Sequence, residues 1–305
     1  MVKQKIDLKG FEPKFEIVSS HLDSKDENYV PVLLNQKPLT LGQFNQEIYP
    51  VIYPSGLVML NPRWTRETYN VFYTKYYDEL YELSIKPDYG KEGIVRNMKE
   101  VWDRVTSRLN IDDLSINNIL DAGCGPGYGL EYLKSLMSDI KLFGIESSEA
   151  SRNELKKNNV TVLDSDIDGD WHKNNANNID VIILRHVVEH MLDPIKSLSN
   201  LRTTLSSEGF MYIAVPDMMN PRTVLRDYTK WWEYWFRSVH TYYYSKETLF
   251  ATLFMAGLEP IFFEEENEEI WCIVKALDKQ KLKEFNINDT NTFHRQMEIL
   301  RKFLP

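Results

Sequence analysis

The stretch ILDAGCGPGYG, residues 119–129, limits what this chain can fold into more than any other part of the sequence. The stretch begins with an apolar run, which is followed by Gly123, Gly125 and Gly127 with G-x-G-x-G spacing. A segment of helix formers comes next. Glycine lets the backbone turn tightly and approach a ligand with no Cβ in the way. Ligands of open α/β sheets lie at the carboxyl ends of the strands. The stretch therefore predicts a ligand-binding turn between a strand and a helix.

Short apolar runs alternate with helical segments from Asn118 to Leu277. Continuous Val, Ile and Leu runs that alternate with helices are typical of a mostly parallel sheet covered on both faces. We expect an α/β fold with a Rossmann-like, seven-stranded, mostly parallel sheet and helices on both faces. The expected strands are 118–123, 141–146, 160–164, 179–184, 209–216, 258–266 and 269–277, the last two as a hairpin, and the expected helices are 128–137, 148–158, 193–206 and 245–257.

The rest of the chain divides by pattern into flanking segments. Residues 1–62 carry short extended runs separated by Pro, Gly and Asn, which indicates a small β-rich appendage. Residues 63–112 have helical spacing and predict a helical lead-in. The main domain is expected over 113–278, with an aromatic loop over 217–244. Residues 279–305 are polar and predict a helical, loosely packed tail.

Composition narrows the classes of function. A formal net charge of -9 argues against a general binder of nucleic acid or of anionic membranes, which needs a basic face. No apolar run approaches the length of a membrane span, and the first residues lack the apolar core of a signal peptide, so we expect a cytoplasmic protein. Cys124 and Cys272 are the two cysteines, which excludes a disulfide framework and a four-cysteine zinc site.

Two carboxylates accompany the glycine loop. Asp121 lies two residues before the first glycine, and Glu146 ends the next expected strand, 19 residues after Gly127. An acidic side chain at that place can accept both ribose hydroxyls of a nucleoside ligand. The dinucleotide pattern G-x-G-x-x-G fails at Tyr128, and Asp121 suits an amine better than a pyrophosphate. An oxidoreductase is therefore disfavoured.

These residues resemble the class I S-adenosylmethionine-dependent methyltransferases over about Asn118 to Leu277. The resemblance implies S-adenosyl-L-methionine as cofactor, with Asp121 near its amino group and Glu146 on its ribose. It also places Asp166 on the exocyclic amine of adenine, with Ile167 beside the ring. Asp164 and Asp168, two residues to either side, are alternatives to Asp166 for this contact. The implied cofactor-binding residues are Asp121, Ala122, Gly123, Gly125, Gly127, Glu146, Ser147, Asp166, Ile167 and Arg185.

The stretch LRHVVEHMLDP contains His186, Glu189 and His190 with H-x-x-E-H spacing. A zinc protease would need this motif inside a long helix, whereas here it lies between an expected strand and Pro194. It is similar to the H-V-L-E-H segment of the methyltransferases, beside the methyl donor. A histidine there can remove a proton from an acceptor hydroxyl. We predict His190 as the base, with His240 and then His186 as further candidates; the alternative is that the motif only braces the turn.

A metal is not expected from the sequence. Some relatives, such as the ubiquinone-pathway O-methyltransferases, hold a divalent metal with an acidic residue at the first position of this motif. His186 occupies that position here. Many sugar methyltransferases carry a cysteine-bound zinc before the main domain, but no cysteine precedes Cys124. The metal prediction is therefore none.

The segment after the fifth expected strand should select the acceptor. Loops at this end of the sheet carry function, aromatic rings suit a sugar or ring-shaped molecule, and arginines suit a phosphate or carboxylate. An aromatic cap that only covers the domain is the alternative. The candidate substrate-binding residues are Arg222, Arg226, Trp231, Trp232, Trp235, Arg237 and Tyr242.

Together these features predict a methyl transfer from S-adenosylmethionine to a hydroxyl oxygen of a small, sugar-like, anionic metabolite. Neither nucleic acid nor membrane is an expected partner, and the sequence does not indicate an oligomeric state. C- or N-methylation of a related metabolite is the first alternative. A catalytically silent methyltransferase-like module that only binds its ligands is the second.

Overall fold

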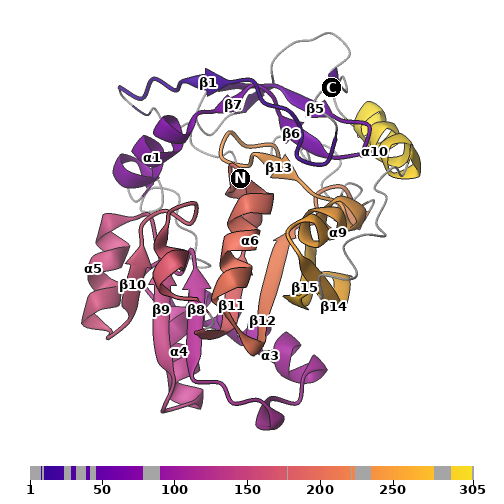
Figure 1. The fold of residues 1–305 in the computed structure, drawn as a ribbon. Coiled ribbons are helices and arrows are strands. Elements are labelled where there is room, and N and C mark those ends of the chain that lie inside the picture. Colours follow the sequence, from indigo (N-terminus) through magenta and orange to yellow (C-terminus); the bar gives the residue numbers. More distant parts are fainter. Residues whose placement is uncertain are drawn as a thin grey trace.

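A computed structural model describes residues 8, 10–23, 29–31, 39–41, 46–77, 90–176, 178–220, 222–223, 235–277 and 290–303. Its centre is a seven-stranded sheet of order β10-β9-β8-β11-β12-β15-β14 (Figure 1). The first five strands of that order are parallel, and β15 and β14 are antiparallel. The strands are β8 (Asn118–Ala122), β9 (Lys141–Ile145), β10 (Thr161–Asp164), β11 (Ile179–Arg185), β12 (Leu205–Pro216), β14 (Leu258–Glu266) and β15 (Glu269–Ala276).

Apolar side chains on both faces explain why these strands form a buried sheet. In β11, Val181 and Ile183 belong to one hydrophobic cluster, whereas Ile182 and Leu184 belong to the cluster on the other side. A strand buried on both faces reads as a continuous apolar run, which is the pattern expected for a parallel sheet. The helices of this domain are α3 (Lys91–Arg108), α4 (Tyr128–Leu136), α5 (Glu149–Lys157), α6 (Pro194–Thr204) and α9 (Lys246–Met255), with short 3-10 turns η2 (Ile111–Asp113), η3 (Trp171–Asn174) and η4 (Val188–His190).

Local signals set where the helices begin. Asp193 accepts the backbone N–H of Lys196 with its side chain, and Pro194 takes the first helical position of α6, where its missing N–H costs nothing. Ser245 and Thr248 form a reciprocal capping box at the start of α9. These caps set where the chain enters each helix, after η4 for α6 and after β13 for α9.

A second layer lies over the carboxyl ends of the parallel strands (Figure 1). Its sheet has the order β13-β6-β5-β2, and β13 comes from the segment after β12, so the later chain returns to complete the N-terminal sheet. Val51, Leu57 and Met59 belong to the same hydrophobic cluster as the central sheet. The elements are β1 (Phe15–Glu16), β2 (Val30–Pro31), β3 (Leu39–Leu41), β4 (Gln46–Ile48), β5 (Pro50–Ile52), β6 (Val58–Leu60), β7 (Arg63–Trp64), α1 (Arg66–Lys75) and β13 (Tyr242–Tyr243).

The predicted fold class is confirmed, including the closing hairpin and the four helices between the strands. Helix α3 packs against α4 and contributes Met98, Val101 and Trp102 to the main core, so it is part of the main domain and more than a lead-in. The C-terminal segment contains the expected helix, α10 (Thr290–Phe303), but this helix is not loosely packed. Its Met297 and Leu300 are buried against the N-terminal sheet, because an apolar stripe runs along this otherwise polar helix. None of the helices in the described residues is long and apolar enough to cross a membrane.

Candidate functional site

The glycine loop joins β8 to α4 at the middle of the sheet. From β8 the chain adds β9 and β10 on one side and then β11 and β12 on the other side, so the direction of strand addition reverses at β8. Such a reversal is the usual ligand position in open α/β sheets. Gly125 has φ +54°, and a Cβ built on it would meet no atom within 4 Å. Gly127 has φ +87°, and a Cβ there would lie 2.6 Å from Leu155 Cδ2. Gly127 is therefore required by packing, whereas Gly125 leaves its face of the loop open for a ligand.

Asp121 and Glu146 lie at adjacent strand ends, as the sequence predicted. The backbone N–H groups of Gly125 and Ser148 each donate to one carboxylate oxygen of Glu146, both at 2.8 Å. Burial, and then the charge of Glu146, raise the pKa of Asp121 to about 8. Two buried carboxylates in such proximity favour a ligand that brings positive charge and hydroxyl donors.

The loop after β10 carries the carboxylates expected to face adenine. Asp166 and Asp168 both form ion pairs at 3.1 Å with Arg66, which projects from α1 in the N-terminal layer. Asp164 accepts the backbone N–H groups of Ser165 and Asp166 and so shapes the loop. Arg66 was not predicted, because one arginine in a helical segment a hundred residues away carries no sequence signal for this contact.

His186 follows β11 directly, with its backbone in the left-handed region at φ +56°. Conformations of this kind are strained for a non-glycine residue and are concentrated at functional sites. Its Nε2 lies 2.7 Å from Glu269 Oε1, and its Nδ1 lies 3.4 Å from Glu189 Oε1. Burial alone would lower the pKa of His186, but contacts with Glu189 and Glu269 raise it to about 9. At neutral pH His186 is therefore an imidazolium and a poor base, unlike the prediction that it could accept a proton.

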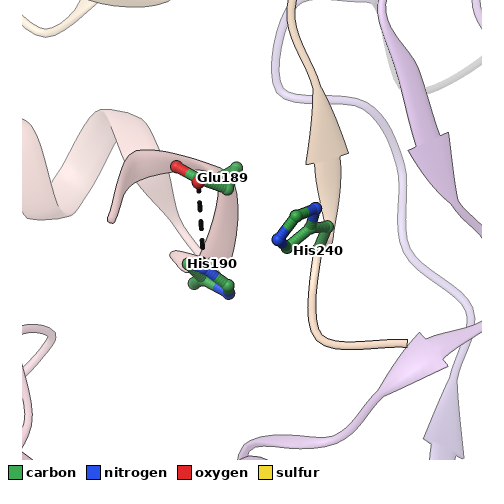
Figure 2. A group of neighbouring side chains, drawn as sticks. All are labelled: Glu189, His190 and His240. Carbon is green, nitrogen blue, oxygen red and sulfur yellow. Dashed lines mark ion pairs between the residues drawn. The ribbon is translucent and has the colours of Figure 1, made fainter. Parts of the chain in front are cut away.

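His190 and His240 come together although fifty positions separate them in the sequence. Their rings are 4.8 Å apart between centroids, and Glu189 Oε1 lies 3.8 Å from His190 Nε2. Figure 2 shows His240, on the segment before β13, facing Glu189 and His190 on the turn η4. Burial lowers the pKa of His190 and lowers that of His240 well below its usual value. Both predicted bases are thus neutral imidazoles at neutral pH.

Hydrogen bonds fix the orientation of the His190 ring. Its Nδ1 lies 2.8 Å from the carbonyl oxygen of Val239 and 3.1 Å from the hydroxyl of Tyr73. A carbonyl can only accept, so Nδ1 carries the proton and Nε2 keeps its lone pair. Tyr73 is a residue that the sequence did not single out, since it lies among several tyrosines on one helical segment.

Arg185 does not match its predicted role. Its guanidinium donates to Glu269 at 2.7 Å, to Glu100 at 2.8 Å and to the carbonyl of Asn97 at 2.9 Å. Arg104 also donates to Glu269, at 2.6 Å. A contact from the Arg185 side chain to the cofactor would have to break this network, so Arg185 serves the framework of the sheet.

The predicted acceptor segment is only partly described. Arg226, Trp231 and Trp232 lie outside the described residues. Trp235 is buried in the core of the N-terminal layer. The Tyr242 hydroxyl accepts a hydrogen bond from Arg63 and donates one to the carbonyl of Leu192, so both residues serve packing. Arg222 is exposed, and Arg237 is half-buried three residues before His240.

A family model described as a methyltransferase domain matches residues 94–261, more than half of the chain. The chain belongs to the class I S-adenosylmethionine-dependent methyltransferases. S-adenosylmethionine is accordingly the methyl donor of this methyltransferase. No curated protein matches its sequence.

Solved structures of methyltransferases are similar to this chain at low identity. An S-adenosylmethionine-dependent methyltransferase from Archaeoglobus fulgidus is 17% identical, with 66% of this chain and 100% of that chain covered and a TM-score of 0.47. Mitomycin 7-O-methyltransferase MmcR is 13% identical, with 66% and 58% covered and a TM-score of 0.48. The CurJ carbon methyltransferase is 14% identical, with 70% and 59% covered and a TM-score of 0.47. This methyltransferase spans less than three fifths of the latter two chains.

Proposed function

We propose that this methyltransferase acts on a hydroxyl oxygen of a small, sugar-like acceptor that carries a negative charge. The observation that supports this most is the group formed by Glu189, His190 and His240 beside the glycine loop. The adjacency rests on packing, since a Cβ on Gly123 would lie 3.0 Å from Val187 Cγ2, two residues before Glu189. A hydroxyl must lose its proton as it reacts, and the neutral imidazoles of this group can take it up.

The cofactor is proposed to lie along the carboxyl ends of β8 and β9. When bound, S-adenosylmethionine supplies a methyl group attached to a positively charged sulfur. In this proposal Asp121 faces the amino group of the cofactor and Glu146 accepts the ribose hydroxyls. Asp166 and Ile167 line the adenine position, and the backbones of Ala122 and Ser147 complete the edge. Glu146 is already held by two backbone N–H groups, which orients its carboxylate before the ligand arrives.

Methyl transfer then needs three things from the chain. The acceptor oxygen must be held in line with the carbon–sulfur bond, water must be kept away, and the hydroxyl proton must leave. The oxygen forms its bond to carbon as the carbon–sulfur bond breaks, and the proton departs at the group of Glu189, His190 and His240. Orientation of this kind contributes much of the rate of a displacement reaction.

The negative charge of the acceptor is proposed from the arginines of the acceptor segment. Arg237 is half-buried near His240, whose backbone N–H donates to the Arg237 carbonyl at 3.0 Å. A guanidinium there can pair with a carboxylate or phosphate of an acceptor whose hydroxyl reaches His240. Arg222, Arg226, Trp231 and Trp232 stay candidate contacts on the same segment.

A mass-spectrometric screen tests this function. The purified chain is incubated with S-adenosylmethionine and matched acceptors that present a hydroxyl, an amine or an activated carbon, with and without a carboxylate or phosphate. We expect a gain of one methyl on an oxygen of a charged, hydroxyl-bearing acceptor. A methyl found on nitrogen or carbon would establish the alternative reaction, and cofactor binding without transfer to any acceptor would indicate a silent module.

A further inference from the structure

Glu189 is a buried carboxylate in an unusual state. Its side chain is 1% exposed. Neither of its carboxylate oxygens accepts a hydrogen bond from any residue that the structure describes. Its nearest polar contacts are His186 Nδ1 at 3.4 Å and His190 Nε2 at 3.8 Å, both beyond a good hydrogen bond. The His186 imidazolium offsets part of this charge, but a carboxylate buried without hydrogen bonds still costs free energy, which a bound cation would lower.

Two imidazole nitrogens complete a set of donors around this carboxylate. Glu189, His190 and His240 each offer one ligand atom, and the three atoms lie within 4.8 Å of one another. Figure 2 shows that the set joins two separate segments, the turn η4 and the irregular stretch that leads into β13. Ligands of a tetrahedral zinc ion lie about 3.4 Å apart, given metal–ligand distances near 2.1 Å. Side-chain movements of roughly 1 Å therefore bring the three donors to that spacing.

The surroundings of His190 match those of a metal ligand. A metal-bound histidine usually donates its other ring N–H to a carbonyl or carboxylate, which fixes the tautomer and the ring. His190 Nδ1 has this partner in the carbonyl of Val239, at 2.8 Å. Its Nε2 is left with a lone pair on the side of Glu189 and His240.

We propose that Glu189, His190 and His240 bind a divalent transition-metal ion. Two imidazoles and one carboxylate form a mixed nitrogen and oxygen set that suits Zn²⁺ or Fe²⁺ and not Mg²⁺ or Ca²⁺, which prefer oxygen alone. The sequence predicted no metal because His186 stands where some relatives have an acidic residue. In the structure His186 pairs with Glu269 instead, and His240 supplies the third donor from another segment.

Three protein ligands leave room for a further ligand, as in catalytic zinc sites. This role of the site rests on the proposed function, since the further ligand would be the acceptor hydroxyl. An oxygen bound to a divalent metal loses its proton more easily. The O–H bond breaks with release of the proton to water, the oxygen forms the new bond to the methyl carbon, and the carbon–sulfur bond breaks.

Calorimetric titration of the chelator-treated full chain with Zn²⁺ tests the site directly. We expect one Zn²⁺ per chain, a Zn²⁺-dependent rise in Tm, and visible absorption bands when Co²⁺ replaces Zn²⁺. Glu189→Gln and His240→Ala should each weaken Zn²⁺ binding at least about 100-fold. Removal of a residue that only hydrogen-bonds to a metal ligand already lowers metal affinity roughly 10–100-fold. His294→Ala, at an exposed histidine of α10, is the matched control and should bind as the original chain does.

Equal Zn²⁺ affinity in the original chain, Glu189→Gln and His240→Ala would overturn the site. Circular dichroism checks that each variant is folded, and the rise in Tm with Zn²⁺ gives a second readout should one variant be unstable. These measurements need no acceptor. If the chain binds the metal but methylates no hydroxyl, the metal site stands and the proposed acceptor is refuted. If it methylates a hydroxyl but binds no metal, the proposed acceptor stands and the metal site is refuted.

Discussion

The backbone N–H of Gly125 donates to Oε2 of Glu146 at 2.8 Å, which joins the glycine loop after β8 to the end of β9. Ser148 holds the other carboxylate oxygen at the same distance. The two strand ends are therefore arranged as one unit before any ligand is present. Four predictions follow from this unit and from the histidines beside it.

The first prediction separates ligand contact from packing within the glycine loop. Gly125→Ala and Gly127→Ala both place a side chain at positive φ, which costs about 1–2 kcal/mol. Only at Gly127 does the new Cβ also collide with Leu155, so Gly127→Ala should have the lower Tm. Gly125→Ala should fold but bind S-adenosylmethionine at least about 10-fold more weakly, since the added methyl occupies the open face of the loop. Calorimetry that finds full affinity in Gly125→Ala would contradict this placement of the cofactor.

The second prediction concerns the pH dependence of stability through Asp121. Its pKa is about 8 in the folded chain, whereas the ordinary value of an aspartate side chain is 3.8. Between these values the folded chain holds a proton that the unfolded chain has released, so stability falls as pH rises. Asp121→Asn removes this loss and should raise the Tm of the cofactor-free chain more at pH 8 than at pH 5, while it weakens cofactor binding. Thermal melts at the two pH values check it, and an equal change at both would refute the buried, neutral Asp121.

The third prediction concerns His190. His190→Ala should lower kcat by about 10²-fold or more, because His190 belongs to the group of Glu189, His190 and His240 at which the acceptor's proton leaves. The dissociation constant for S-adenosylmethionine should stay the same, because His190 contacts Tyr73 and Val239 and not the glycine loop. Initial rates and calorimetry measure the two effects, with His294→Ala as control. An unimpaired His190→Ala enzyme would leave this residue with only a bracing role.

Much of the fold was predictable because its signals are local. The strands from β8 to β15 are apolar runs bounded by turns, and the glycine loop, Asp121 and Glu146 are adjacent to strand ends whose order follows from the alternation. The pairing of Tyr242 and Tyr243 with Met59 and Val58 was not predictable, since antiparallel pairing over such a separation leaves no local pattern. Helix α10 appeared polar because its buried residues form only a narrow stripe.

The candidate site was predictable in its parts and not in its arrangement. His186, Glu189 and His190 share one motif, and the simple expectation was that they act together. The left-handed backbone at His186 turns its ring to Glu269, more than eighty positions later in the chain, while His240 takes the place beside Glu189. Arg66 and Tyr73 reach the site from the N-terminal layer, and contacts between layers depend on packing that a single sequence does not show.

The fourth prediction concerns the place of S-adenosylmethionine between the carboxyl ends of β8 and β9. The measurement is calorimetric titration with S-adenosylmethionine of the original chain, Glu146→Gln and the control Glu154→Gln, whose exposed side chain pairs with Lys157. Glutamine keeps the shape of Glu146 and one acceptor oxygen, so the fold should survive. We predict one cofactor per chain, a loss of about 1–3 kcal/mol of binding free energy in Glu146→Gln from the lost charged hydrogen bonds, and no change in Glu154→Gln. If the original chain bound no S-adenosylmethionine, or if Glu146→Gln bound it with equal affinity, this placement of the cofactor at Glu146 would be contradicted.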